Sequence, residues 1–332
     1  MPEVGVAVLG ATGVVGAELI ELLSEADWVQ SLVPIASPGC KTPDVMFRGR
    51  PTKVLNATAD ALESVQVVFA AAPRGKQAAL LQAAAKAGVV VIDIGNDFAD
   101  EREVPVSGLG LNPSELDHVG EAGVVVTPGP LALTLAAVAA PLHEDYGLLS
   151  ARGTSLMSAS SAGNAGIHEL SGQVAALFNS QDPPRKVFEE GLAFDLVPEH
   201  GDLIGQWLRS ELEAVRHASR LLGLPGDRFA LTQVITPTFV GLGLSLHLRT
   251  ETPIDPEGVA HCLAEAPYVK LGAGRDLQPR SRTGHPIVRV GRLRADPGGD
   301  GVHLWASTDP IRLTVANAVA TVEALLERGQ LG

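Results

Sequence analysis

The fold is decided by a glycine-rich stretch near the amino end, Val4-Gly-Val-Ala-Val-Leu-Gly-Ala-Thr-Gly-Val-Val-Gly16. Its apolar pattern predicts a buried strand over Val4–Leu9 and a helix over Val14–Ser24. The glycines between them allow a tight turn and a close approach to a pyrophosphate, whose charge a helix N-terminus stabilises. We therefore expect a dinucleotide site, although the same turn also occurs in α/β folds that bind nothing. The expected contacts are Gly10, Thr12, Gly13, Val14 and Val15.

Apolar runs alternate with helical patterns over the first 130 residues. Further strands are expected at Val29–Ala36, Val65–Ala71 and Val89–Ile94, with an Ala/Leu-rich helix at Lys76–Ala87. Such alternation is typical of an α/β domain, in which a parallel sheet is covered by helices on both faces. The sequence thus predicts a Rossmann-type domain.

The pattern changes after the turn at Thr127-Pro-Gly-Pro130, where helices and period-2 strands follow in mixed order. The expected helices are Leu131–His143, Gly166–Phe178, Leu208–Leu222 and Val315–Glu327. The expected strands are Leu231–Val240, Gly243–Arg249, Ile287–Arg294 and Val302–Ala306. This arrangement predicts a second, α+β domain with a mixed or antiparallel sheet.

Charge excludes several classes of function. The 332 residues carry 25 Lys and Arg against 38 Asp and Glu, a net charge of −13, without a basic block. Nucleic acid and anionic membrane surfaces both require clustered Lys or Arg, so neither is an expected partner. The start does not resemble a signal peptide, and Thr127-Pro-Gly-Pro130 interrupts the longest uncharged run, Val124–Leu142. We expect a soluble, cytoplasmic protein.

The segment after the second expected strand bears on the choice of dinucleotide. An acidic residue about 20 residues beyond the glycine-rich turn would hold the ribose of NAD. The segment Ala36-Ser-Pro-Gly-Cys-Lys41 contains no acid, whereas Ser37 and Lys41 can accept a 2′-phosphate. We therefore expect NADP, without the bidentate arginine that binds such a phosphate best.

Other reactive side chains form no recognisable site in the sequence. Cys40 is expected in a loop near the adenosine end of the dinucleotide, and Cys262 is expected as a buried thiol on the apolar face of a helix over Glu257–Glu265. Four serines cluster at Ser155, Ser158, Ser160 and Ser161. They lack a Gly-x-Ser-x-Gly turn and an assignable His partner. The nine histidines show neither His-x-x-x-His nor Cys-x-x-His spacing, so no metal site is expected.

A series of short stretches, distinctive in order and spacing, covers nearly the whole chain. They are the turn Gly10–Gly16, Val91-Ile-Asp93, Val104-Pro-Val106 running to Asn112, Ser160-Ser-Ala-Gly163 with Glu169-Leu170, Ala193-Phe194 with Val197-Pro198, Val290-Gly-Arg-Leu-Arg294, Leu304-Trp305, Asp309 with Arg312, and Asn317-Ala-Val319. In these stretches the chain resembles the aspartate-semialdehyde dehydrogenase family. The resemblance implies a dinucleotide-binding domain over residues 1–128 together with the C-terminal helix at 313–332. It also implies a domain over 129–312 that carries catalysis and dimerisation.

The catalytic positions of that family are replaced in this chain. The family uses a cysteine thiolate that attacks the substrate carbonyl, and the resemblance places Pro130 at that position. The other matched positions are Leu242 for the general-base histidine, Ile235 for a substrate-binding arginine, Met157 for the glutamine that orients the carbonyl, Ala99 (near Arg102) for a phosphate-binding arginine, and Glu213 for a lysine. Loss of three cations and gain of a carboxylate disfavour an aspartyl phosphate. No catalytic residue is therefore expected.

The stretch Thr154-Ser-Leu-Met-Ser-Ala-Ser160 is most similar to the non-catalytic, Usg-type paralogues of the family. The resemblance implies a homodimer with possible residual NADP binding, although the turns Ala70–Pro73 and Asp309–Thr314 also depart from the family's cofactor pattern. Two alternatives stay open. One is an active NADP-dependent oxidoreductase with an altered substrate, using Ser160 or a water. The other is association with an active paralogue.

Overall fold

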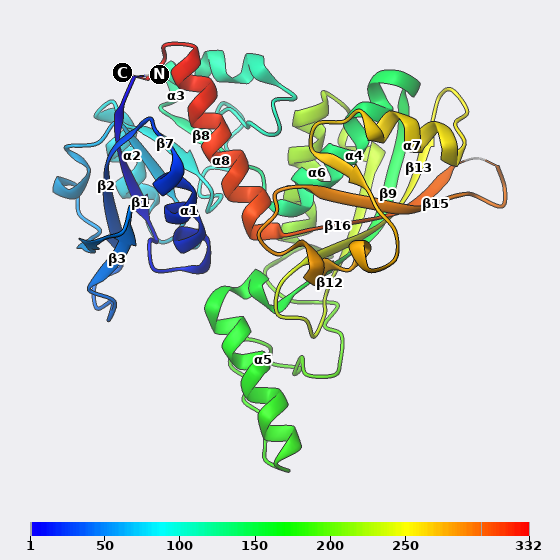
Figure 1. The fold of residues 1–332 in the computed structure, drawn as a ribbon, viewed down its shortest axis with the longest axis horizontal. Coiled ribbons are helices and arrows are strands. Elements are labelled where there is room, and N and C mark those ends of the chain that lie inside the picture. Colours follow the sequence, from blue (N-terminus) through cyan, green and yellow to red (C-terminus); the bar gives the residue numbers. More distant parts are fainter. Residues whose placement is uncertain (1, 300, 332) are drawn as a thin grey trace. The chain divides into compact units, whose positions relative to one another are not determined.

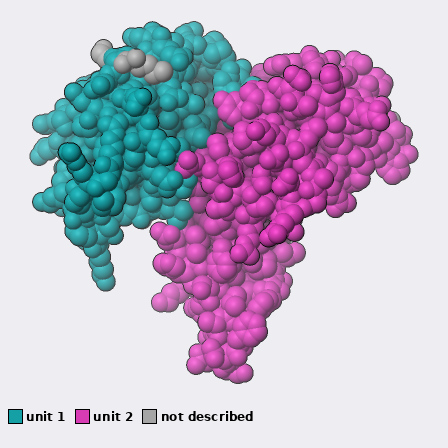
Figure 2. Space-filling model, in the orientation of Figure 1, with its two compact units in different colours: residues 1–129, 314–332 teal, residues 130–313 magenta. Residues whose placement is uncertain are grey.

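The computed structural model describes residues 2–299 and 301–331. They form two compact units, one of residues 1–129 with 314–332 and one of residues 130–313, here called unit 1 and unit 2 (Figure 2). The architecture is the expected class, a Rossmann-type parallel sheet in unit 1 and a second, mixed sheet in unit 2. No helix in the described part of the chain is long and apolar enough to span a membrane.

Unit 1 is built on a six-stranded sheet in which every strand pairs in parallel with its neighbours. In spatial order the strands are β5 (Leu55–Asn56), β2 (Val29–Ala36), β1 (Val4–Leu9), β6 (Val67–Ala70), β7 (Val90–Asp93) and β8 (Val124–Val126). The chain passes from β1 to β2 on one side and then crosses to β6 on the other, so the strand order reverses at β1. Ligands of doubly wound sheets bind outside the carboxyl ends of the strands at such a reversal.

Helices cover both faces of this sheet (Figure 1). On one face, α1 (Val14–Glu25) and α8 (Pro310–Glu327) pack against the side chains of Val4, Val6 and Val8 in one apolar cluster. The helix α2 (Ala78–Lys86) packs on β7, and its buried residues lie outside that cluster. Because both faces are covered, β1 is buried along its whole length. The remaining elements are α3 (Val119–Ala122) and the hairpin of β3 (Asp44–Phe47) and β4 (Arg50–Lys53).

Unit 2 contains a mixed six-stranded sheet. Its strands, in spatial order, are β12 (Phe229–Ile235), β9 (Leu148–Met157), β13 (Leu242–Thr250), β16 (Val302–Thr308), β15 (Val288–Ala295) and β14 (Val269–Leu271). The helix α4 (Pro130–Tyr146) contacts both α6 (Arg209–Leu222) and α7 (Pro256–Ala264), and all three helices contact the sheet. The helix α5 (Gly163–Phe178) instead extends away from the sheet (Figure 1). A two-stranded ribbon, β10 (Leu203–Ile204) with β11 (Trp207–Leu208), precedes α6.

The largest differences from the sequence prediction are two element ends and one whole strand. The strand expected over Leu231–Val240 ends at Ile235, because Pro237 has no N–H and Thr236 N–H already bonds Met157 O at 2.7 Å. The strand β9 was not expected, because its Ser, Thr and Arg residues interrupt the alternation of apolar and polar side chains by which a strand is identified. The last helix begins at Pro310 rather than Val315, because Asp309 accepts hydrogen bonds from the N–H groups of the first turn.

Candidate functional site

The glycine-rich turn of unit 1 has the geometry of an anion-binding loop. Gly10 has φ +87°, and a Cβ there would lie 2.8 Å from the backbone nitrogen of Ala72. A Cβ on Gly16 would lie 2.2 Å from the carbonyl oxygen of Gly10, so a side chain at either position would break the turn. Gly13 begins α1 without a side-chain cap. The turn therefore presents the N-terminus of a twelve-residue helix, which attracts negative charge.

The segment after β2 lies beside this turn. Cys40 Sγ is 3.5 Å from Thr12 Oγ1, and this hydrogen bond lowers the pKa of the exposed Cys40 thiol. Ser37 and Lys41 flank Cys40 and are both exposed. The structure thus brings the segment that holds Ser37 and Lys41 next to the turn that holds Thr12.

A buried carboxyl group, Asp93, ends β7 at the same edge of the sheet. Its side chain is fully buried, and Oδ2 accepts a hydrogen bond from Phe98 N–H at 2.8 Å. Oδ1 has no hydrogen-bond partner among the described residues. Burial raises the pKa of Asp93 to about 6. This group was not among the sequence-predicted site residues.

Ala99, which the resemblance matches to a phosphate-binding arginine, is 3% exposed. Arg102 lies on the surface nearby in sequence, and Arg74 forms an ion pair with Asp100. In unit 2, Glu213 lies half-buried on α6. At these matched positions, unit 1 has a small apolar side chain, Ala99, and unit 2 has a carboxylate, Glu213.

In unit 2, three of the positions that the resemblance matches to functional residues of the family form one row across the sheet. Met157 at the end of β9 is the register partner of Ile235 on β12 and of Leu242 on β13. The exposed fractions of Ile235, Met157 and Leu242 are 1%, 7% and 0%. We call these three residues the apolar row. Sequence matching named them one by one, but only the strand pairing shows that they are neighbours, and none of them can transfer a proton or bind an anion.

Pro130 is the first residue of α4 and belongs to unit 2. Proline fits this position because the first turn of a helix has no intrahelical use for its missing N–H. It is half-buried, and its carbonyl accepts a hydrogen bond from Thr134 Oγ1 at 2.7 Å. A helix N-terminus activates a thiolate when a cysteine is present, but a pyrrolidine ring offers nothing to activate.

In unit 2, neither Cys262 nor the serine pair Ser158 and Ser160 supplies a substitute nucleophile. Cys262 is 7% exposed on α7, as predicted, and burial raises the pKa of its thiol to about 12, with a further contribution from Asp145. Ser158 Oγ and Ser160 Oγ are buried and hydrogen-bond each other at 2.9 Å. Because a serine needs an adjacent base to become nucleophilic, this hydroxyl pair stabilises the turn after β9 rather than a reaction.

The buried carboxylate of Glu169 on α5, which belongs to the stretch Glu169-Leu170 that resembles the family, holds a neighbouring loop in place. Glu169 accepts hydrogen bonds from the N–H groups of Lys186, Val187 and Phe188 at 2.7–2.8 Å. Burial raises the pKa of Glu169, but the three donors outweigh burial and hold it below its ordinary value. Gln173, one turn later, accepts from the N–H groups of Leu192 and Ala193. These two side chains hold the loop that follows α5.

Large apolar side chains are exposed on the same part of unit 2. Phe178 at the end of α5 is 78% exposed and lies edge-to-face with Phe194, which is 68% exposed. Other exposed large apolar side chains of unit 2 are Leu177, Leu196, Leu203, Ile204, Trp207 and Phe239. We call this set, with Phe178 and Phe194, the exposed apolar surface; exposed large apolar side chains are a feature of protein–protein contacts when they form one patch.

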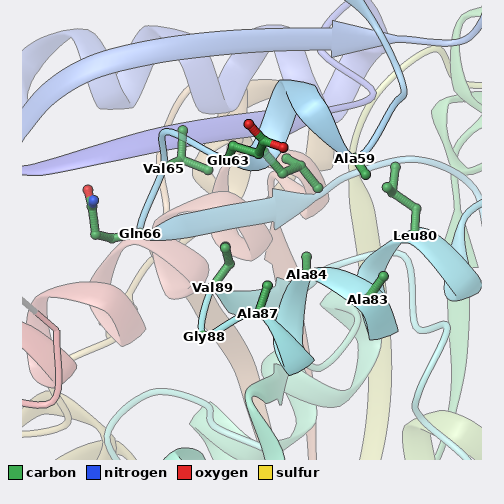
Figure 3. Close-up of a pocket in the computed structure, with 11 residues that line it drawn as sticks. Ala59, Glu63, Val65, Gln66, Leu80, Ala83, Ala84, Ala87, Gly88 and Val89 are labelled. Carbon is green, nitrogen blue, oxygen red and sulfur yellow. The ribbon is translucent and has the colours of Figure 1, made fainter.

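A hollow of about 460 Å³ lies in unit 1 (Figure 3). Its lining comes from residues 59–66, which lead into β6, from α2, and from residues 87–89, which lead into β7. The hollow is therefore at the amino ends of the strands, whereas the glycine-rich turn follows the carboxyl end of β1. Its lining contains no Lys or Arg, so it does not suit a phosphate.

Strand pairing also brings together side chains that the sequence spacing did not connect. His247 on β13 is the register partner of His303 on β16, and Asp296 follows β15. One ligand atom from each of these three residues lies within 4.8 Å of the others. The expectation of no metal site rested on spacing within one helix or loop, a test that misses residues paired across strands.

Comparison with known proteins places the chain in a family. Residues 5–119 match the NAD-binding domain of semialdehyde dehydrogenases and residues 139–313 match their dimerisation domain. The chain is 29% identical to aspartate-semialdehyde dehydrogenase 2 of Vibrio cholerae over 98% of both chains, and 29% identical to a USG-1 protein homolog of Azotobacter vinelandii over 99% of both. The structure of Vibrio cholerae aspartate semialdehyde dehydrogenase II complexed with ASA matches with a TM-score of 0.93 at 28% identity, covering 98% of this chain and 99% of that one. The chain belongs to the semialdehyde dehydrogenase family, and its similarity to the aspartate-semialdehyde dehydrogenases within that family is confirmed.

Proposed function

We propose that this protein is a Usg-type homologue of aspartate-semialdehyde dehydrogenase that binds NADP, forms a homodimer and does not reduce aspartyl phosphate. The apolar row carries the proposal. Dehydrogenation through a thiohemiacetal needs a nucleophile, a base and groups that hold an anionic substrate. Ile235, Met157 and Leu242 occupy the matched positions as buried hydrocarbon and thioether side chains, and Pro130 occupies the position of the nucleophile.

Restoring the reaction through other residues of unit 2 is also disfavoured. Ser158 and Ser160 bond each other, and Cys262 is a buried thiol with a raised pKa. A water could act as a nucleophile only next to a general base, and the apolar row offers none. Electrostatics act in the same direction, because Glu213 replaces a lysine and repels a doubly charged acyl phosphate.

NADP binding is proposed for residues 1–128 together with 313–332. The contacts would come from the backbone of Gly10, Thr12, Gly13, Val14 and Val15, with Ser37 and Lys41 at the 2′-phosphate. Support comes from the uncapped helix N-terminus and from the 3.5 Å contact that joins the Cys40 segment to Thr12. Lys41 supplies a point charge, which favours NADP over NAD without the specificity of an arginine.

Dimerisation is proposed for residues 129–312, with the exposed apolar surface as the contact. Phe178 and Phe194 would lose water on association, which is the main favourable term in forming such an interface. A second copy of this chain is the proposed partner.

One experiment with two readouts tests the proposed function. The purified protein is titrated with NADPH by calorimetry, and NADPH formation is followed in the presence of aspartate semialdehyde, NADP and phosphate. We expect saturable NADPH binding without phosphate-dependent turnover, with the Vibrio cholerae enzyme as the positive control. Phosphate-dependent NADPH formation by this chain would overturn the loss of activity. A flat calorimetric titration would overturn the NADPH-binding proposal. Turnover with another aldehyde would favour the alternative of an active NADP-dependent oxidoreductase with an altered substrate.

A further inference from the structure

A cluster of two imidazoles and one carboxylate lies on the sheet of unit 2. His247 and His303 face each other on adjacent antiparallel strands, with ring centroids 4.6 Å apart. Asp296 reaches both rings, since Oδ2 lies 3.3 Å from His247 Nε2 and Oδ1 lies 3.8 Å from His303 Nε2. The backbone holds Asp296 in place through its N–H bond to Gly301 O at 2.8 Å. Three strands, β13, β15 and β16, thus deliver three potential ligands to one point.

The hydrogen bonding of this cluster is incomplete. His247 Nε2 is buried and makes no hydrogen bond within the described part of the chain, although the Asp296 carboxylate is close. Such a buried polar atom without a partner is uncommon in native proteins and is often explained by a bound ion or water. Gly301 packs closely against this atom, because a Cβ at that position would lie 2.6 Å from His247 Nε2.

We propose that His247, Asp296 and His303 bind a divalent transition-metal ion of the Zn²⁺ type. Zinc bonds imidazole nitrogen and carboxylate oxygen at about 2.0–2.2 Å in tetrahedral geometry, which puts neighbouring ligand atoms roughly 3.3–3.5 Å apart. The 3.3 and 3.8 Å separations differ from this by no more than a small side-chain movement. The side chains are 26%, 35% and 27% exposed for His247, His303 and Asp296, so a water can complete the coordination.

The donor set and its surroundings select the class of metal. Two of the three ligands are imidazoles, which suit Zn²⁺, Cu²⁺ and Ni²⁺, whereas Mg²⁺ and Ca²⁺ prefer oxygen. Exposed Arg152 and Arg294 are the register partners of His247 and His303, and so lie on the same face of the sheet. The positive charge of these two arginines repels a cation that is attracted only by the Asp296 carboxylate. Direct bonds from the metal to the imidazole nitrogens are therefore the attraction that would hold the ion. The bound ion would clamp the β15–β16 hairpin to β13.

The test uses the full-length protein, freed of metal with a chelator and titrated with Zn²⁺ by calorimetry. We expect one tight site per chain and a rise in the thermal midpoint, since a ligand that binds only the folded state stabilises it. Co²⁺ in place of Zn²⁺ should give visible ligand-field bands of a nitrogen-containing site. Neither readout depends on enzyme activity or on NADP.

Two substitutions and a matched control make the result specific. His247→Asn and His303→Asn should each weaken Zn²⁺ binding at least about tenfold, whereas His261→Asn, an exposed histidine on α7 of the same unit, should not change it. Metal-free thermal midpoints close to that of the unsubstituted protein would show that the variants are folded. Absence of a Zn²⁺ site in the unsubstituted protein would overturn the proposal. Equal Zn²⁺ binding by all three variants would also overturn it, because the metal would then lie elsewhere.

Discussion

The edge of the unit 1 sheet that carries the glycine-rich turn and the edge of the unit 2 sheet that carries the apolar row are built differently. In unit 1 the edge is shaped by backbone, because Gly10 and Gly16 leave no room for a Cβ and α1 begins without a cap. In unit 2 the edge is formed by the side chains of Ile235, Met157 and Leu242. A backbone site is lost only when the turn itself breaks, whereas a side-chain site can be erased while the sheet and its core remain. This difference is the basis on which the proposed function combines NADP binding with loss of aspartyl-phosphate reduction in one fold.

The first way to break this comparison is Gly16→Val, which we expect to have the largest effect. The Cβ would lie 2.2 Å from Gly10 O, so the turn and the first helical turn of α1 must move apart. We expect the free energy of unfolding to fall by about 5 kcal/mol, near the upper end for a single substitution, and NADPH binding to disappear. Urea denaturation and calorimetry measure the two effects.

The matched control for this change is Gly120→Ala in α3 of the same unit. A Cβ there would contact nothing within 4 Å and the residue has no left-handed backbone. We expect stability to change by no more than about 0.5–1 kcal/mol, upward because Ala favours helix, with NADPH binding intact. Retention of tight NADPH binding by folded Gly16→Val would refute a site made by the backbone of this turn.

The second substitution, Ile235→Arg, introduces in unit 2 the side chain that the resemblance assigns to this position. Because Ile235 is 1% exposed and pairs with Met157, the new guanidinium would be buried beside a thioether and near Leu242. We expect a loss of about 4 kcal/mol in the free energy of unfolding, since no carboxylate lies in the apolar row to pair with the charge. Ile235→Leu, which conserves volume, should lose less than about 1.5 kcal/mol. Equal stability of the Arg and Leu variants would mean that the row remains an open polar site.

Sequence reasoning located the elements that depend on local pattern. The strand Val4–Leu9 and the glycine-rich turn lie as predicted, because continuous apolar residues and φ-permissive glycines are properties of neighbours in the chain. The start of α8 was placed five residues late, although Asp309 followed by Pro310 is an N-terminal signal that the sequence contains.

Features that depend on which strands pair, and in which register, could not be predicted from the sequence. The central strand β9 carries Ser150, Arg152, Thr154 and Ser155, so its period was hidden, and with it the register that aligns Met157 with Ile235 and Leu242. The cluster of His247 with His303 was missed for the same reason, since the two residues are 56 positions apart and meet only across β13 and β16. In the sequence, Asp93 is only part of a stretch that resembles the family. Its raised pKa follows from its burial, which the sequence does not show.

The third prediction concerns titration, in which the two edges also differ. The apolar row has no ionisable group, whereas Asp93 at the edge of unit 1 is fully buried with a pKa raised to about 6 from an ordinary value of 3.8. The folded state therefore holds the Asp93 proton more tightly than the unfolded state. Its contribution to stability is complete below about pH 4 and is lost as the pH rises through 6, by at most about 3 kcal/mol.

Asp93→Asn should remove this dependence, because the amide oxygen can still accept from Phe98 N–H but does not ionise. The measurement is the difference between the variant and the unsubstituted protein in free energy of unfolding, followed from pH 4 to pH 7. Taking this difference cancels the contributions of two groups in unit 2 whose effect on stability changes with pH in the opposite direction. The pKa of Glu169 is held low by its three donors despite burial, and the pKa of His200 is lowered by burial. Both lose their contribution as the pH falls, and both are unaffected by the substitution. We expect the variant to gain stability relative to the unsubstituted protein as the pH rises; parallel curves would show that Asp93 titrates as an ordinary carboxyl group and that the edge of unit 1 is open to water.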